Sequence, residues 1–164
     1  MRNVLACFEI VKNCSVIVSA SLTGRPASSD SATASASSLT SGQKLVVKNS
    51  DNCIHNVHVV PKAAGNEEHN DAQMTGGADL TYTFAKPEMF ITFKCDVHPW
   101  MFAWVSVFDG PYYAITDKEG KFVIKNVPPG KYTLEANHRK LGVQTSDVEV
   151  TDSNVTADFT FEVK

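Results

Sequence analysis

Short runs of apolar and β-branched residues, each followed by turn-forming residues, recur along the whole 164-residue chain. Apolar and polar positions alternate in many of these runs, whereas the i, i+3, i+4, i+7 recurrence of an amphipathic helix is rare. Alternation with period two is typical of strands that bury one face. The pattern therefore predicts an all-β chain. Strands of a first module are predicted at residues 4–18, 44–49, 56–60, 79–84, 90–94 and 101–108.

Two stretches of a different composition divide the chain. Residues 19–41 are dominated by Ser, Ala and Thr and lack the large apolar side chains that would offset the entropy of ordering. We expect most of this stretch to be a mobile insertion, with room for a short strand at 32–37. A turn-forming cluster, Asp109-Gly110-Pro111, follows the last strand of the first module. The predicted domains are therefore residues 1–108 and 109–164.

The second module shows the same alternation in shorter strands. Residues 117–120 form a predicted four-residue hairpin loop, in which Gly120 can adopt the positive φ that such a turn needs. Strands are predicted at residues 113–116, 121–124, 131–136, 143–150 and 154–163. These elements predict a small antiparallel sandwich.

Charge and hydropathy exclude two classes of partner. The net charge is -3 and the Lys and Arg residues are scattered, which argues against nucleic-acid binding. No run approaches the roughly 20 apolar residues that span a bilayer. At the start of the chain, Glu9 and Lys12 interrupt the apolar positions, so no export signal is visible there.

The most informative segment is FKCDVHPWMF at residues 93–102, where Cys95, His98 and Met101 follow one another at three-residue intervals. A tight loop with this spacing can direct a thiol, an imidazole and a thioether toward one point. Two imidazoles and a thiolate with a weak axial thioether describe an electron-transfer copper site. His55, about 40 residues upstream at the start of a predicted strand, is the candidate second imidazole. Its neighbour Asn56 could hydrogen-bond across to the ligand loop and tune the metal.

His55-Asn56-Val57 followed by Cys95-x-x-His98-Pro99-x-Met101 resembles the amicyanin and plastocyanin group of cupredoxins, over about residues 44–108. The resemblance implies a Greek-key β-sandwich and one copper ion that cycles between Cu(I) and Cu(II). It makes His55 and His98 the imidazole ligands, Cys95 the thiolate and Met101 the axial ligand. It also implies a redox protein as the partner and a periplasmic or secreted location. The sequence departs from the amicyanin loop at Trp100, which is larger than the usual Phe.

Residues 116–122 and 127–132, TDKEGKF and VPPGKY, resemble the carboxypeptidase regulatory-like, or transthyretin-like, domains. This resemblance rests mainly on turn residues and implies an accessory role. The expected architecture is thus a cupredoxin-like Greek-key β-sandwich followed by a small antiparallel β-sandwich.

A site with four protein ligands has no open position for a substrate, so we expect an electron carrier and not an enzyme. Three alternatives stay open. The same ligands could serve a copper carrier or sensor without electron transfer, or the sandwiches could be a binding module without metal. Cys95 and His98 could also form a nucleophile pair, although no oxyanion hole is evident.

The remaining histidines have simpler interpretations. His58 lies three residues after His55, so on a strand it points to the opposite face and is expected to be structural. His69 belongs to a predicted polar loop, and His138 lies in the second module. We expect neither to belong to the site.

The other three cysteines are Cys7, Cys14 and Cys53. A disulfide among them, for example between Cys14 and Cys53, needs Cα atoms within about 7 Å, which the sequence cannot show.

Overall fold

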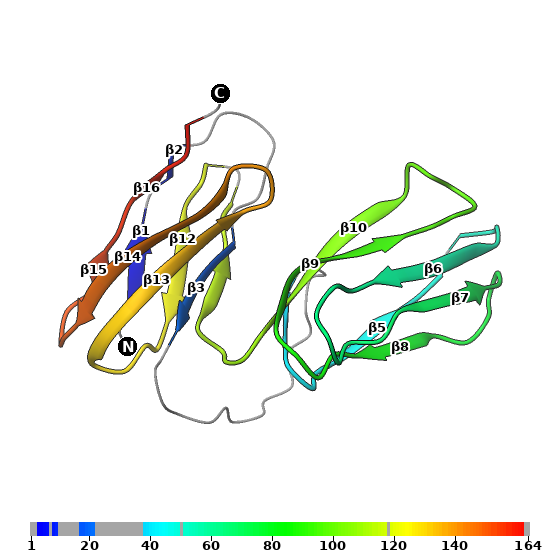
Figure 1. Ribbon diagram of the computed structural model, residues 1–164, viewed down its shortest axis with the longest axis horizontal. Coiled ribbons are helices and arrows are strands. Elements are labelled where there is room, and N and C mark those ends of the chain that lie inside the picture. Colours follow the sequence, from blue (N-terminus) through cyan, green and yellow to red (C-terminus); the bar gives the residue numbers. More distant parts are fainter. Residues whose placement is uncertain are drawn as a thin grey trace. The chain divides into compact units, whose positions relative to one another are not determined.

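The computed structural model describes residues 3–6, 8–9, 17–21, 38–49, 51–117 and 119–162 (Figure 1). The described residues form strands joined by turns, and none of them is helical, which confirms the predicted all-β class. Among them there is accordingly no helix with the length and apolar character needed to span a membrane. The chain divides into two compact units. Unit 1 comprises Met1–Pro26 with Gly110–Lys164, and unit 2 comprises Ala27–Asp109.

Unit 2 is a sandwich of two sheets of unequal size. Its strands are β4 (Ser38–Thr40), β5 (Lys44–Val47), β6 (His55–Val60), β7 (His69–Gln73), β8 (Leu80–Thr83), β9 (Glu88–Lys94) and β10 (Phe102–Phe108). One sheet has the order β4-β10-β9-β6-β7, and the other pairs β5 with β8. Because the chain crosses repeatedly from one sheet to the other, the two sheets are inseparable parts of one fold.

The alternation of apolar residues accounts for the core between these sheets. On β6 every second side chain is buried, beginning with His55 and continuing with Val57 and Val59. Ile91 on β9 is completely buried, and burial of such a side chain stabilises a fold by about 1.5–3 kcal/mol. The buried cluster consists of Leu39, Val57, Val59, Tyr82, Phe84, Ile91, Phe93, Val105 and Val107.

The strand registers determine where the ligand loop lies. In the antiparallel pair β6 and β9, His58 lies opposite Lys94, and in the pair β9 and β10, Phe102 lies opposite Lys94. Residues 95–101 therefore connect the end of β9 to the start of β10. Continuing the β6 register beyond Lys94 brings Asn56 opposite Asp96, so the first residues of β6 lie beside this loop.

A β-bulge interrupts the pairing of β9 with β10 between Val105 and Val107. Phe90 has a φ of 59°, and its N–H donates to the Ser106 hydroxyl at 3.0 Å. Ser106 is fully buried, so this bond satisfies a polar group in the core. The bulge bends the hairpin whose far end holds the ligand loop.

Unit 1 combines N-terminal and C-terminal strands. Its strands are β1 (Asn3–Ala6), β2 (Phe8–Glu9), β3 (Ile17–Ser21), β11 (Tyr113–Ile115), β12 (Phe122–Lys125), β13 (Gly130–His138), β14 (Gly142–Val150), β15 (Val155–Thr156) and β16 (Phe159–Thr160). Their orders are β12-β1-β15, β11-β3-β13-β14 and β16-β2. The core is built from Phe122, Ile124, Val127, Tyr132, Leu134, Ala136, Val150, Ala157, Phe159 and Phe161.

This division differs from the expected one, 1–108 and 109–164, in the N-terminal strands. β1 pairs with β12 and β15, and β3 lies between β11 and β13, so both belong to the C-terminal unit. The turn at residues 117–120 forms as expected, with Gly120 at φ 78°. The strands on its two sides, β11 and β12, enter different sheets, however. In these sheets β11 pairs with β3 and β12 pairs with β1, where a hairpin would pair the two with each other.

The expected mobile insertion at 19–41 falls mostly outside the described residues and stays a prediction, whereas the expected loop at His69 needs correction. Both ends of the Ser-rich stretch 19–41 are strands, since β3 extends to Ser21 and β4 places Leu39 in the core with 2% of its surface exposed. The strand considered at 32–37 lies outside the described residues. His69 begins the edge strand β7 and does not belong to a loop, and its ring centroid is 5.3 Å from that of Tyr82.

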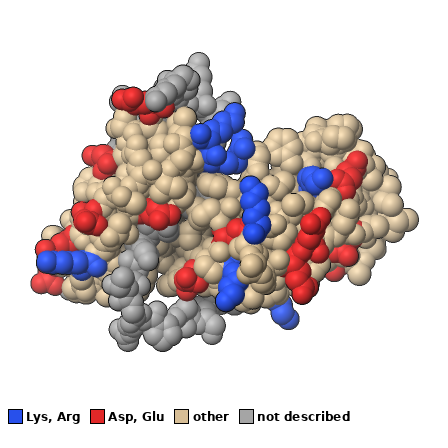
Figure 2. Space-filling view, in the orientation of Figure 1, with Lys and Arg blue, Asp and Glu red and all other residues tan. Residues whose placement is uncertain are grey.

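Basic and acidic side chains are interspersed on the face shown in Figure 2. Such mixing of opposite charges is typical of a solvated surface, whereas binding to a polyanion requires a concentration of positive charge.

Candidate metal site

The ligand loop is closed by two backbone hydrogen bonds. The Cys95 N–H donates to the Met101 carbonyl at 3.0 Å, and the Met101 N–H donates to the His98 carbonyl at 2.8 Å. The first bond continues the pairing of β9 with β10 past Phe102. As a result the loop is a tight turn at the end of a rigid hairpin, and its side chains are positioned by strand geometry.

Three of the predicted ligands converge. Cys95 Sγ lies 3.8 Å from His55 Nδ1 and 3.7 Å from His98 Nδ1, and the two Nδ1 atoms are 3.0 Å apart. Cys95 and His55 are 5% and 8% exposed, and His98 is half-buried. Two segments separated by 40 residues thus present one sulfur and two nitrogens to a common point.

The spacing of these atoms suits a metal ion. The point equidistant from the three atoms lies about 2 Å from each, close to the bond lengths of about 2.0 Å to imidazole nitrogen and about 2.3 Å to thiolate that zinc, an ion of similar size, has in proteins. A thiolate with two imidazoles is a donor set for soft and borderline ions. The residues therefore fit a bound copper ion in both spacing and chemistry.

Met101 lies at the other end of the loop. Its side chain is 38% exposed and lines a cleft of about 550 Å³, together with His55 and Cys95. The cleft walls are mainly apolar and come from β5, β6, β9 and β10, for example Leu45 and Phe93. In the described part of the chain the smaller sheet consists of β5 and β8, and residues of β5 line the cleft together with residues of the larger sheet.

The environment of Cys95 favours its thiolate. Burial raises the pKa of the thiol, but hydrogen bonds from the backbone N–H of Asn56, from the His55 side chain and from His98 oppose this effect. Together they lower the pKa of Cys95 to about 6. A sulfur that is already ionised near neutral pH is the form that binds metals.

The second ring nitrogen of His55 is also bound. Nε2 lies 3.0 Å from Asp51 Oδ2 and 3.4 Å from Cys53 Sγ. The hydrogen bond with Cys95 raises the pKa of His55, burial lowers it, and Asp51 raises it again, with a net upward shift. A proton on Nε2, donated to Asp51, leaves the Nδ1 lone pair free to bind an ion and fixes the ring orientation.

In the described part of the chain Cys53 is a free, exposed cysteine. Cys7 and Cys14 lie outside the described residues, and so does the disulfide considered between Cys14 and Cys53. The donor atoms of Cys53, His55 and His98 all lie within 4.8 Å of one another. Cys53 therefore borders the site as a further thiol. Sequence reasoning missed Cys53 and Asp51 as parts of the site, although both precede His55 by four residues or fewer.

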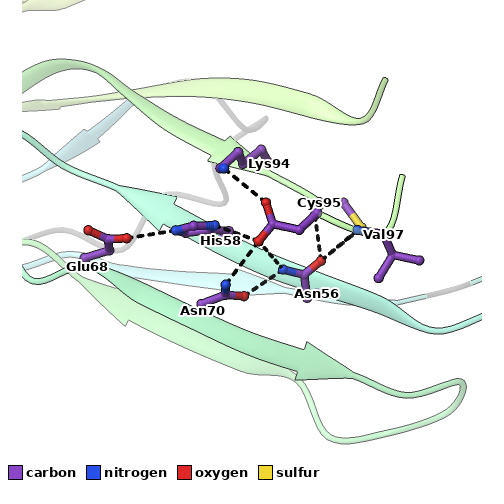
Figure 3. A network of polar contacts seen from close by, with 8 residues as sticks. Asn56, His58, Glu68, Asn70, Lys94, Cys95 and Val97 are labelled. Atoms are coloured by element: carbon purple, nitrogen blue, oxygen red, sulfur yellow. Dashed lines mark hydrogen bonds and ion pairs between the residues drawn. The ribbon is translucent and has the colours of Figure 1, made fainter. Parts of the chain in front are cut away.

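Asn56 connects β6 to the ligand loop, as the sequence suggested. Its Oδ1 accepts hydrogen bonds from the Asp96 N–H at 2.7 Å and the Val97 N–H at 3.3 Å, and it lies 3.3 Å from Cys95 Sγ. Its Nδ2 donates to Asn70 Oδ1 at 2.6 Å and to Asp96 Oδ2 at 3.1 Å (Figure 3). Asp96 was not predicted, and the only sequence signal is a charged residue directly after the candidate thiolate.

The other histidines are placed apart from the three donor atoms. His58 lies on the opposite face of β6 from His55, as predicted, between Asp96 at 2.7 Å and Glu68 at 2.8 Å. His138 is buried in unit 1, where its Nδ1 accepts the N–H groups of Lys140 and Leu141.

The family of carboxypeptidase regulatory-like domains matches residues 98–163 of the chain. The match confirms the resemblance of the second module and covers the C-terminal strands of unit 1, together with β10 and part of the ligand loop. No curated protein and no solved structure matches the chain. The cupredoxin resemblance of unit 2 stays a prediction from its residues.

Proposed function

We propose that unit 2 is a cupredoxin-like module with a mononuclear type 1 copper site, which carries electrons between redox proteins. The ligands would be His55, Cys95 and His98, with Met101 as the weak axial ligand. The observation that carries the proposal is the convergence of the sulfur and two ring nitrogens, 3.0 to 3.8 Å apart, on a point about 2 Å from each. When bound, copper would supply a one-electron couple between Cu(I) and Cu(II).

The residues of unit 2 would keep the site rigid during electron transfer. The two backbone bonds of the loop hold Cys95 and Met101 in register, and Asp51 holds the His55 ring. Ligands that do not rearrange suit both oxidation states of copper. We therefore propose no turnover of a small substrate.

A protein partner would approach at His98. Its ring lies 5.3 Å from that of Trp100, which is 73% exposed, and Val97 and Phe102, within and directly after the same loop, are 51% and 57% exposed. Exposed apolar side chains grouped in this way are typical of protein-binding surfaces. The short path from His98 to the surface would serve as the electron route to a redox protein, in a periplasmic or secreted setting.

A copper carrier or sensor is the second candidate, and the cleft of about 550 Å³ favours it. A carrier must release its ion, and the cleft beside His55, Cys95 and Met101 gives solvent or another ligand access to that side of the site. The exposed thiol of Cys53, 3.4 Å from His55, would be a second soft ligand during exchange. The two candidates share ligands and differ in whether the bound copper changes oxidation state.

The deciding experiment is the visible spectrum of the protein loaded with Cu(II). An intense thiolate-to-copper charge-transfer band is expected in the wild type, absent in Cys95→Ser and retained in the matched control Cys53→Ser. A weak band that survives in Cys95→Ser would contradict the type 1 site. Rapid reversible reduction at a defined potential would favour electron transfer, and copper binding without a reversible couple would favour the carrier.

A further inference from the structure

Figure 3 labels Asn56, His58, Asn70 and Lys94, which belong to a polar network on the outer face of the larger sheet of unit 2. All four are bonded to the Asp96 carboxylate. Its Oδ2 accepts hydrogen bonds from three side chains, and its Oδ1 forms an ion pair with Lys94 at 3.0 Å. The three donors are His58 Nδ1 at 2.7 Å, Asn56 Nδ2 at 3.1 Å and Asn70 Nδ2 at 3.1 Å. These donors come from β6 and β7, so one loop carboxylate ties the ligand loop to two strands.

This network determines which way the Asn56 amide points. Both acceptors on its Nδ2 side, Asp96 Oδ2 and Asn70 Oδ1, require the NH₂ group to face them. The carbonyl must then face the N–H groups of Asp96 and Val97. A flipped amide would place its NH₂ against these two N–H donors and would lose every one of its bonds.

We propose that Asp96 is a positioning residue for the Cys95 sulfur, acting through Asn56. The carboxylate locks the Asn56 amide, the amide holds the backbone of residues 96 and 97 against β6, and Cys95 is thereby fixed beside His55. This inference rests on the proposed function in so far as the fixed sulfur is a metal ligand.

The charges around Asp96 support this role. His58 lies between two carboxylates, those of Asp96 and Glu68, and donates from one ring nitrogen to each. The hydrogen bonds to Glu68 and Asp96 raise the pKa of His58, which favours the cation. With Lys94, the network holds two positive and two negative groups, so it adds no net charge next to the thiolate.

The contribution of Asp96 can be separated from a general effect of charge. Glu68→Gln removes a carboxylate from the same network but touches neither Asn56 nor the loop, which makes it the matched control for Asp96→Ala. Asp96→Asn, which keeps an oxygen acceptor for Asn56, is the conservative variant. Together the three variants distinguish loss of the acceptor from loss of a negative charge.

The first measurement uses the metal-free full chain and amide hydrogen exchange. The N–H groups of residues 96 and 97 are expected to lose protection by about tenfold in Asp96→Ala, the effect of losing about one net hydrogen bond. Asp96→Asn should restore most of the protection, and Glu68→Gln should match the wild type. The amide of the core strand residue Ile91 reports whether each variant is folded. Equal effects of Asp96→Ala and Glu68→Gln on residues 96 and 97 would overturn the inference.

The second measurement is the copper spectrum of the same variants. A broadened and weakened thiolate band in Asp96→Ala, restored in Asp96→Asn and unchanged in Glu68→Gln, would support positioning of the sulfur. An unchanged band in Asp96→Ala would refute it while leaving the copper site intact. If the wild type forms no thiolate band at all, the proposed function fails, and the exchange experiment still decides whether Asp96 positions the loop.

Discussion

The Nδ1 atoms of His55 and His98 lie 3.0 Å apart, although 43 residues separate the two histidines in the chain. Their rings meet edge to face, with centroids 4.8 Å apart and an interplanar angle of 62°. Two neutral imidazoles cannot both direct lone pairs at each other at this distance, so either a proton or a metal ion must lie between them. The Cys95 sulfur lies beside both, 3.8 Å from His55 Nδ1 and 3.7 Å from His98 Nδ1, so the proposed copper ion would have all three atoms within reach.

The two imidazole ligands are expected to differ in how they can be replaced. His98→Gly opens a half-buried position, so added imidazole should enter it and restore the thiolate band. His55→Gly, at a position that is 8% exposed and held by Asp51, should not be restored in this way. Titration of both variants with imidazole, followed by visible absorption, checks the difference. Equal restoration would show that burial does not distinguish the two ligands.

Met101→Gln is expected to retain copper and to lower its reduction potential. The amide oxygen is a harder ligand than the thioether and therefore favours Cu(II). A tenfold gain in the preference for Cu(II) corresponds to a shift of about 59 mV. Cyclic voltammetry measures the shift, and Met74→Gln, at an exposed methionine that does not line the cleft, is the control. An unchanged potential would show that Met101 is not an axial ligand.

Core substitutions in the two units should have separable effects. Ile91→Ala in unit 2 and Leu134→Ala in unit 1 each empty a fully buried position and should each lower the free energy of unfolding by about 2–5 kcal/mol. Because each unit has its own core, only Ile91→Ala should also destabilise the copper chromophore. Thermal unfolding followed by circular dichroism and by the thiolate band distinguishes the two. Loss of the band at the same temperature in both variants would contradict separate cores.

Acid should destabilise unit 1 through His138. Burial is the main cause that lowers the pKa of His138, and the positive charge of Arg139 adds to it. The unfolded chain therefore binds a proton at this residue more readily than the folded chain does. The contribution of neutral His138 to the free energy of unfolding is present above the ordinary histidine pKa of about 6.5 and is lost as the pH falls below it. Protonation would also remove the acceptor for the N–H groups of Lys140 and Leu141.

The measurement is the pH dependence of unit 1 unfolding between about pH 8 and about pH 5. His138→Gln, which can still accept a hydrogen bond but does not titrate, should show a smaller loss of stability on acidification. His69→Gln in unit 2 controls for the removal of one imidazole. A steeper loss in His138→Gln than in the wild type would contradict the assignment.

Strand positions and side-chain faces could be predicted from the sequence because they depend on local alternation. The strand predicted at 90–94 is β9, and the opposite faces of His55 and His58 are those observed. Pairing partners could not be predicted in the same way. Alternation indicates which face of a strand is apolar, but it does not tell that β3 has β11 and β13 as its neighbours.

Polar elements were the harder part of both fold and site. β7 has the sequence HNDAQ, and its strand conformation comes from its pairing with β6 and not from its own composition. The spacing of Cys95, His98 and Met101 sufficed to identify the loop, since metal ligands need particular residue types. Asp51 and Asp96 orient other side chains of the site, a role that many residue types can fill. The sequence therefore does not single them out, and the structure does.

The hydrogen bond between the Cys95 N–H and the Met101 carbonyl fixes the number of residues that the ligand loop can contain. A residue inserted between these two positions would either break that bond or bulge outward and carry His98 away from His55. Loops grafted onto this hairpin should therefore succeed only when they keep its residue count as well as its ligand residues.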